Sequence, residues 1–134
     1  MSGTWVLDSE ALSLYLRADR KMTARLAVAL QDDVRVVIAA ATIVEAEALS
    51  RLAVVPLTQD LARAASNVLK SAGRHGHKYA IDAMVVATAL AAADKPVTVL
   101  TSDVDDISTL LGDRLDRAGM ERTGSSSKVK ILPV

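Results

Sequence analysis

The segment Val97-Thr98-Val99-Leu100-Thr101-Ser102-Asp103 is an apolar, β-branched run that ends in a carboxylate, and it decides the fold. A run of this kind predicts a short, buried strand of a parallel sheet. Trp5-Val6-Leu7-Asp8 repeats the pattern near the start of the chain. In open α/β sheets the ligand crevice lies outside the carboxyl ends of the strands. We therefore expect Asp8 and Asp103 to converge although they are far apart in sequence.

The rest of the chain alternates between helical and strand-like segments. Apolar or β-branched runs predict further strands at 34–39, 54–57 and 129–132, and Pro133 suits an edge strand at the last of these. Asp19 and Thr58 are suitable N-caps for two of the helices. Helical spacing predicts helices at 10–17, 20–30, 42–52, 58–71, 80–93 and 106–117. This βα order predicts an α/β fold with a parallel sheet.

Composition bounds the class of protein. A chain of 134 residues with 51% hydrophobic content predicts one domain, residues 1–134, with a proper core. The absence of cysteine excludes disulfides, thiolate zinc sites and cysteine nucleophiles. No signal peptide is visible, and the longest apolar stretch, 83–93, is about half of the roughly 20 residues that a bilayer requires. We expect a cytoplasmic protein that does not span a membrane.

Charge and aromatic content give little support for nucleic-acid binding. Lys plus Arg equals Asp plus Glu at 16 each, so net charge does not indicate such a partner. Only 2% of the residues are aromatic, which disfavours base stacking on aromatic platforms. A basic surface remains only if several acids are gathered in one pocket and neutralised by a metal ion.

Two groups of acids at strand ends are candidate metal ligands. A carboxylate beside a buried strand needs a partner, so Asp8 is predicted to bind a metal, with a cap or turn role for the next helix as the alternative. After the strand at 97–101, Asp103, Asp105 and Asp106 lie within four residues. Helix capping explains one or two of them, and a divalent cation relieves the repulsion of a third. We predict that Asp103 is a ligand, supported by Asp105 or Asp106.

Two further acids each have a structural alternative. Asp82 opens the apolar helix that follows a polar, glycine-rich loop, and an N-cap role is as good an explanation there as metal binding. Glu45 completes Thr42-Ile43-Val44-Glu45, which fits a capping box, and Glu47 competes with it for a catalytic role. Taken locally, Glu45 is more often structural.

In this order along the chain, four segments resemble the motifs of PIN domains: Val6-Leu7-Asp8-Ser9, Thr42-Ile43-Val44-Glu45, 81–89 and Leu100-Thr101-Ser102-Asp103. More narrowly, they are similar to VapC-like ribonuclease toxins of prokaryotic toxin–antitoxin modules, and the resemblance covers essentially the whole chain. It implies a three-layer α/β/α sandwich around a central parallel sheet of four to five strands.

The resemblance also implies an activity. It implies a Mg²⁺- or Mn²⁺-dependent endoribonuclease that hydrolyses phosphodiester bonds and leaves 5′-phosphate and 3′-hydroxyl ends. The catalytic carboxylates it implies are Asp8, Glu45, Asp82 and Asp103, which bind the metal together with Asp106. Hard oxygen ligands suit Mg²⁺ and Mn²⁺. The implied partners are a structured RNA such as tRNA or rRNA, a cognate antitoxin protein, and a second copy of the chain.

Other interpretations stay open at this point. The domain can be a non-catalytic PIN-like module that only binds RNA or acts as a scaffold, although four intact acids argue against this. A receiver-type phosphotransfer domain needs a lysine at a strand end, whereas Lys95 precedes its strand. His75 and His77 lack a third ligand for a transition metal. Their loop is expected to face solvent or, with Arg74 and Lys78, to contact RNA phosphates.

Overall fold

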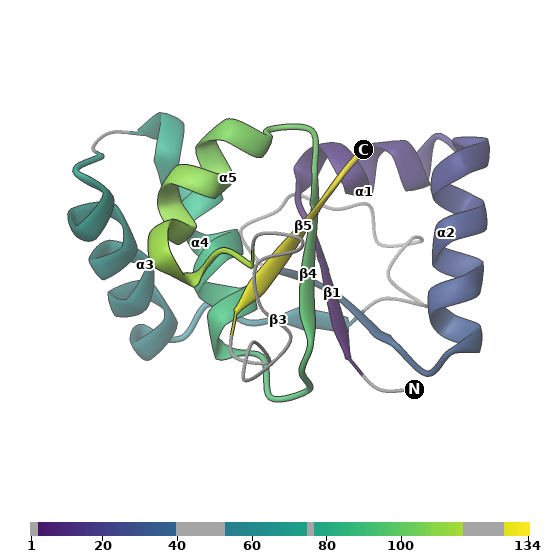
Figure 1. The fold of residues 1–134 in the computed structure, drawn as a ribbon, viewed down its shortest axis with the longest axis horizontal. Coiled ribbons are helices and arrows are strands. Elements are labelled where there is room, and N and C mark those ends of the chain that lie inside the picture. Colours follow the sequence, from purple (N-terminus) through teal and green to yellow (C-terminus); the bar gives the residue numbers. More distant parts are fainter. Residues whose placement is uncertain (1–2, 40–52, 75–76, 117–127) are drawn as a thin grey trace.

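A parallel sheet forms the centre of the molecule. The computed structural model describes residues 3–39, 53–74, 77–116 and 128–134 (Figure 1). In this part of the chain the sheet has five strands in the order β3-β2-β1-β4-β5, and every neighbouring pair is parallel. The strands are β1 (Thr4–Leu7), β2 (Arg35–Ala39), β3 (Ala53–Val55), β4 (Val97–Thr101) and β5 (Val129–Pro133).

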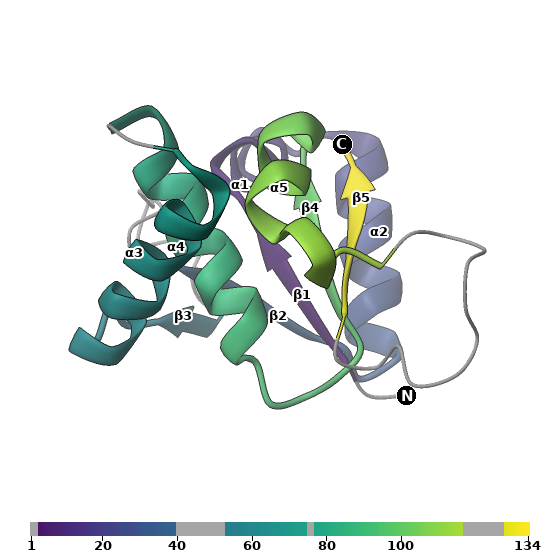
Figure 2. The ribbon, with the colours of Figure 1, turned by 60° about the vertical axis from the view of Figure 1, so that its left-hand side comes forward.

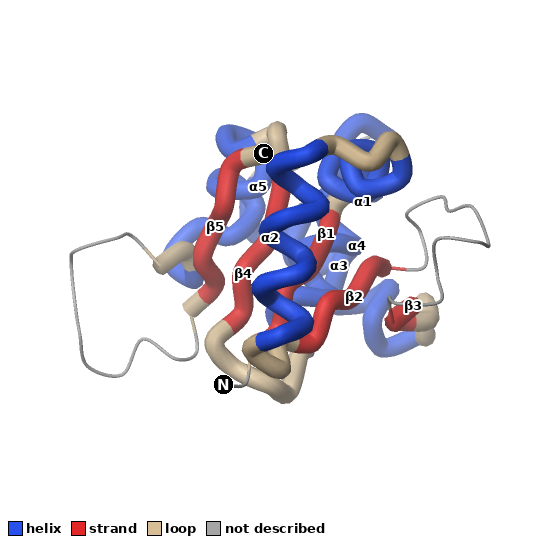
Figure 3. The backbone as a smooth tube through the Cα atoms, turned by 90° about the vertical axis from the view of Figure 1, so that its right-hand side faces the viewer, coloured by secondary structure: helices blue, strands red, loops and turns tan. Residues whose placement is uncertain are grey.

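Helices cover both faces of this sheet. On one face lie α1 (Ser9–Leu16) and α2 (Arg20–Gln31), and Figure 3 shows α2 in front of the sheet, between β4 and β1 in the view. On the other face lie α3 (Gln59–Ala72), α4 (His77–Ala91) and α5 (Val104–Leu111), and Figure 2 shows these three side by side. The predicted α/β fold, a three-layer sandwich around a parallel sheet, is therefore confirmed.

The two-residue period of the strands explains the two cores. Val6, Val37 and Val99 belong to the buried cluster that includes residues of α3, α4 and α5. Their neighbours in sequence, Leu7, Ile38 and Leu100, belong to the cluster that includes residues of α1 and α2. Because successive side chains of a strand point to opposite faces, near-continuous apolar strands bury both faces of a parallel sheet.

The sheet order places the end of β1 beside the end of β4. Leu7 is paired with Ile38 on one side and with Leu100 on the other, and the Asp8 N–H donates to the Leu100 carbonyl at 3.1 Å. The chain leaves β1 toward one face, into α1, and leaves β4 toward the other face, into α5. Such a point, where the strand order reverses, is where open α/β sheets have their ligand crevice.

Several helix ends agree with the sequence signals. Asp19 accepts a hydrogen bond from the Met22 N–H at 2.9 Å, and Thr58 accepts one from the Leu61 N–H at 3.1 Å. Both residues are the predicted N-caps. Helix α3 ends at Gly73, whose φ of 65° is the left-handed conformation that glycine adopts without strain.

Other boundaries differ from the prediction. Helix α4 begins at His77, not at 80, so Asp82 lies inside the helix and does not open it. The predicted helix at 106–117 is wrong at both ends: α5 spans 104–111, and a short 3₁₀ turn, Gly112–Arg114, follows it at a glycine with positive φ. Strand β3 ends before Pro56, which has no N–H for the ladder.

The helix expected at 42–52 lies outside the described residues. Within the described residues, every helix is too short or too polar to cross a lipid bilayer.

Candidate metal centre

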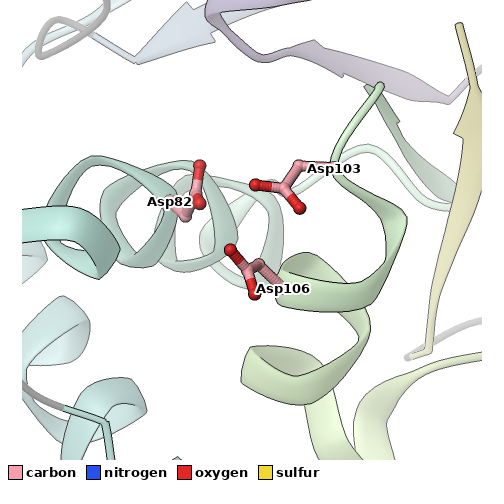
Figure 4. A group of neighbouring side chains, drawn as sticks. All are labelled: Asp82, Asp103 and Asp106. Carbon is pink, nitrogen blue, oxygen red and sulfur yellow. The ribbon is translucent and has the colours of Figure 1, made fainter.

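Three carboxylates from two helices meet at the carboxyl-terminal side of the sheet. Asp82 comes from α4, and Asp103 and Asp106 come from the start of α5. One oxygen from each residue lies within 4.8 Å of the others, and Figure 4 shows the three carboxylates directed toward a common space. The structure thus brings together three of the five acids that the sequence suggested as metal ligands.

Local structure explains why two of these acids come from one turn. Asp103 directly precedes α5, and Asp106 follows three residues later, so both side chains lie on the same side of the first turn. Asp103 occupies the N-cap position, yet its side chain makes no capping hydrogen bond. The Asp103 carboxylate therefore does not cap α5 as the alternative predicted. Figure 4 shows this carboxylate facing Asp82 and Asp106.

Asp82 reaches the same point from α4. It is the sixth residue of this helix, so the N-cap alternative is excluded by position. The next residue, Ala83, is fully buried in the core, while Asp82 itself is only half-buried. Packing of α4 against α5 therefore holds Asp82 at the edge of the core, where its carboxylate faces the other two.

Asp105 does not share this position. It lies in the first turn of α5, is exposed, and is not one of the three grouped acids. Between the two residues that the sequence left open, the geometry favours Asp106. Glu45 lies outside the described residues, as do His75 and the side chain of His77, so the structure does not test their predicted roles.

Asp8 is the N-cap of α1. Its carboxylate accepts a hydrogen bond from the Ala11 N–H at 2.8 Å, and the residue is only 4% exposed. Burial raises the pKa of the Asp8 carboxyl above its ordinary value, because desolvation disfavours the charged form. Hydrogen bonds from Ala11, from the Thr101 hydroxyl and from the Glu10 N–H oppose this shift. The alternative role as a cap is thus realised, and metal binding by Asp8 stays a prediction.

Thr101 connects Asp8 to the three-acid group. It is the last residue of β4 and is fully buried. Its hydroxyl donates to the Asp8 carboxylate and accepts a hydrogen bond from the Asp103 N–H at 2.8 Å. The sequence prediction assigned no role to Thr101. The available signal was a polar side chain at the end of an otherwise apolar strand, immediately before the acidic turn.

The spacing of the three acids suits a hard divalent cation. Oxygen ligands of Mg²⁺ lie at about 2.0 to 2.1 Å, so two oxygens on opposite sides of the ion are at most about 4.2 Å apart. The upper bound of 4.8 Å between the carboxylate oxygens is close to this value, and small side-chain rotations remove the difference. Like charges at such distances repel, and a cation between them relieves the repulsion. The residues therefore fit Mg²⁺ or Mn²⁺.

Comparison with known proteins gives a likeness of fold. No protein-family profile matches the sequence, and no characterised protein is significantly similar to it in sequence. Among solved structures, a chain in the crystal structure of VapBC2 from Rickettsia felis, bound to a DNA fragment from their promoter, superposes with a TM-score of 0.58. The two chains are 12% identical, and the match covers 78% of this chain and 91% of the other. At this level of identity, the likeness shows that the two chains share a fold.

Proposed function

We propose that this chain is a metal-dependent endoribonuclease and the toxin of a toxin–antitoxin pair. The observation that carries the proposal is the group formed by Asp82, Asp103 and Asp106, in which one oxygen from each residue lies within 4.8 Å of the others. The fold shared with a chain of the VapBC2 complex supports it. The motif resemblance over the four acidic segments agrees with both.

In this proposal the three acids hold Mg²⁺ or Mn²⁺ beside a phosphodiester. When bound, such an ion lowers the pKa of a water molecule and stabilises the charge that develops on the phosphate. The carboxylates of Asp103 and Asp106 are fixed by one helical turn and that of Asp82 by a buried helix, so the site is arranged before substrate binds. Asp8 and Glu45 are proposed as the further catalytic acids, with Asp8 acting close to the centre through Thr101.

The proposed partner surface is on the opposite face of the sheet. Leu16, Val28 and Leu30 are large apolar side chains on α1 and α2, and each is exposed. The neighbouring structure is VapBC2 bound to a DNA fragment from their promoter. By analogy, we propose that an antitoxin, and a second copy of this chain, cover these helices, and that the protein acts in the cytoplasm as a single domain.

Cleavage of RNA by purified protein tests the activity. Structured RNA such as tRNA is incubated with Mg²⁺, Mn²⁺ or EDTA, and the new 5′ ends are mapped. We expect discrete cuts that require metal and fall at least a hundredfold in Asp103→Asn and Asp82→Asn, since mutation of groups that set up a metal site removes most of the rate. Asp105→Asn is the matched control, because it removes an acid of the same turn that is outside the group.

The outcomes separate the candidate functions. Cuts that persist in both Asp→Asn variants would show a contaminating nuclease or a different site. RNA binding without cutting under either metal would favour the non-catalytic RNA-binding module. Protein that neither binds nor cuts RNA would contradict the proposal.

A further inference from the structure

A cation, Arg74, follows the end of α3. Arg74 follows Gly73, and its N–H donates to the Leu69 carbonyl at 3.0 Å, which is the hydrogen bond that closes a Schellman-type helix end. Its guanidinium carbon lies 5.7 Å from the centroid of the Tyr79 ring. The backbone and the side chain of Arg74 are therefore both held, the latter by a cation–π contact.

Tyr79 places this cation on the side of α4 that carries Asp82. The two residues are three positions apart, so their side chains are neighbours on the helix surface, separated along its axis by about 4.5 Å. Side chains of a helix lean toward its N-terminus, so Tyr79 extends away from Asp82 toward the α3–α4 connection. Figures 1 and 2 show the start of α4 at the same end of the molecule as the start of α5.

Charge explains why a nuclease needs such a residue there. Three carboxylates and one divalent cation leave a net negative charge, and an RNA strand is itself negative, so a cation outside the acid group must attract it. Arg74 is exposed, and its guanidinium makes no ion pair with any carboxylate of the described residues. The positive charge of Arg74 is thus not neutralised by one of those acids, and the Tyr79 ring favours one position of its guanidinium.

We propose that Arg74, held over the Tyr79 ring, binds a phosphate of the RNA strand next to the bond that is cut; this inference rests on the proposed function. Arginine is suited to the role because its planar guanidinium forms two parallel hydrogen bonds with phosphate oxygens. The ring of Tyr79 serves as the support that keeps the guanidinium in place. The contact is made in the ground state and the transition state alike, so it affects substrate binding more than the rate of chemistry.

Two measurements test this role, one of which does not need catalysis. The first is the Kd of a short fluorescent oligoribonucleotide in Ca²⁺, as a function of salt. The second is KM and kcat for its cleavage in Mn²⁺. The variants are Arg74→Ala, Arg74→Lys and Tyr79→Leu. Arg63→Ala is the matched control, because Arg63 is an exposed arginine within α3, about 13 Å along the helix axis from the end that Arg74 follows.

We expect Arg74→Ala to raise Kd and KM about tenfold while kcat changes less than twofold, as expected for one charged hydrogen-bonding contact at an exposed site. The slope of log Kd against log salt should fall by about 0.7, the value for one phosphate contact on a single strand. Arg74→Lys should recover part of the affinity, and Tyr79→Leu should lose about threefold. Thermal unfolding of each variant reports any effect on folding.

The two proposals fail separately. Equal Kd values and salt slopes for Arg74→Ala and Arg63→Ala overturn the role of Arg74, even if the wild-type protein cuts RNA. Wild-type protein that binds RNA without cutting it contradicts the nuclease, and the comparison of Kd values still decides the role of Arg74. Wild-type protein that neither binds nor cuts RNA contradicts both.

Discussion

Replacing Thr101 with valine tests the connection between Asp8 and Asp103. Valine has nearly the shape of threonine, so the substitution removes one hydroxyl group from a fully buried position. That hydroxyl donates to the Asp8 carboxylate and accepts from the Asp103 N–H at 2.8 Å. Both hydrogen bonds are lost together in Thr101→Val.

The two losses differ in size. A hydrogen bond to a charged group contributes about 1.5 to 3 kcal/mol, and Asp8 is too buried for water to replace the donor. Asp103 is exposed, so water can accept from its N–H and this loss is smaller. Burying a methyl group in place of the hydroxyl offsets about 0.8 kcal/mol. We expect Thr101→Val to lower the free energy of unfolding by about 1 to 2 kcal/mol at pH 7.

Urea unfolding at pH 7 and at pH 4 measures this effect. At the lower pH more of the Asp8 carboxyl is protonated, because its pKa is raised, and a neutral acceptor loses only about 0.5 to 1.5 kcal/mol. The difference between Thr101→Val and wild type should therefore shrink. Thr101→Ser keeps the hydroxyl, and Thr98→Val removes a hydroxyl from the same strand that makes no side-chain hydrogen bond within the described residues. A Thr101→Val protein as stable as Thr98→Val at pH 7 would refute the reasoning.

Two further predictions concern the acids themselves. Asp8→Asn keeps an N-cap without a buried charge, so in metal-free buffer it should be at least as stable as wild type at pH 7, whereas Asp8→Ala loses the cap and about 1 kcal/mol. Because the pKa of the Asp8 carboxyl is raised in the folded protein, the stability of the wild type falls as pH rises through this pKa, so the advantage of Asp8→Asn over the wild type should decrease toward pH 4. Urea unfolding between pH 4 and pH 7 measures this advantage. Equal losses of stability in Asp8→Asn and Asp8→Ala would contradict the prediction. Mn²⁺ at about one hundred times its Kd should stabilise the wild type by about 2.7 kcal/mol. Asp105→Asn should keep this stabilisation and Asp106→Asn should lose it, which thermal unfolding with and without EDTA measures.

Much of the fold was predictable from local signals. The apolar runs at 5–7, 34–39, 97–101 and 129–132 became strands because β-branched side chains suit a sheet buried on both faces. Asp19 and Thr58 were recognisable as caps because a cap bonds to its own helix three residues on. The start of α4 was missed, since His77, Lys78 and Tyr79 lack the apolar periodicity that marks a helix.

The candidate site was predictable in its residue types and less so in its grouping. The acids after β1 and β4 were visible in the sequence, but the choice between Asp105 and Asp106 depended on where α5 begins. Thr101 was not assigned a role because its partners belong to α1 and to the turn before α5, and Asp8 lies 93 residues away in the chain. Arg74 and Tyr79 were part of one polar loop in the sequence, without a sign that they touch.

By itself, the sequence determined the alternation of strands and helices, the two faces of each strand, and the presence of acids after β1 and β4. These features depend on interactions between residues a few positions apart, which a sequence displays directly. Tertiary structure alone decided that Asp82 lies beside Asp103 and Asp106, while the Asp8 side chain caps α1. The physical reason is that α4 and α5 pack on one face of the sheet and α1 on the other, and that packing joins residues whose separation along the chain carries no information about their contact.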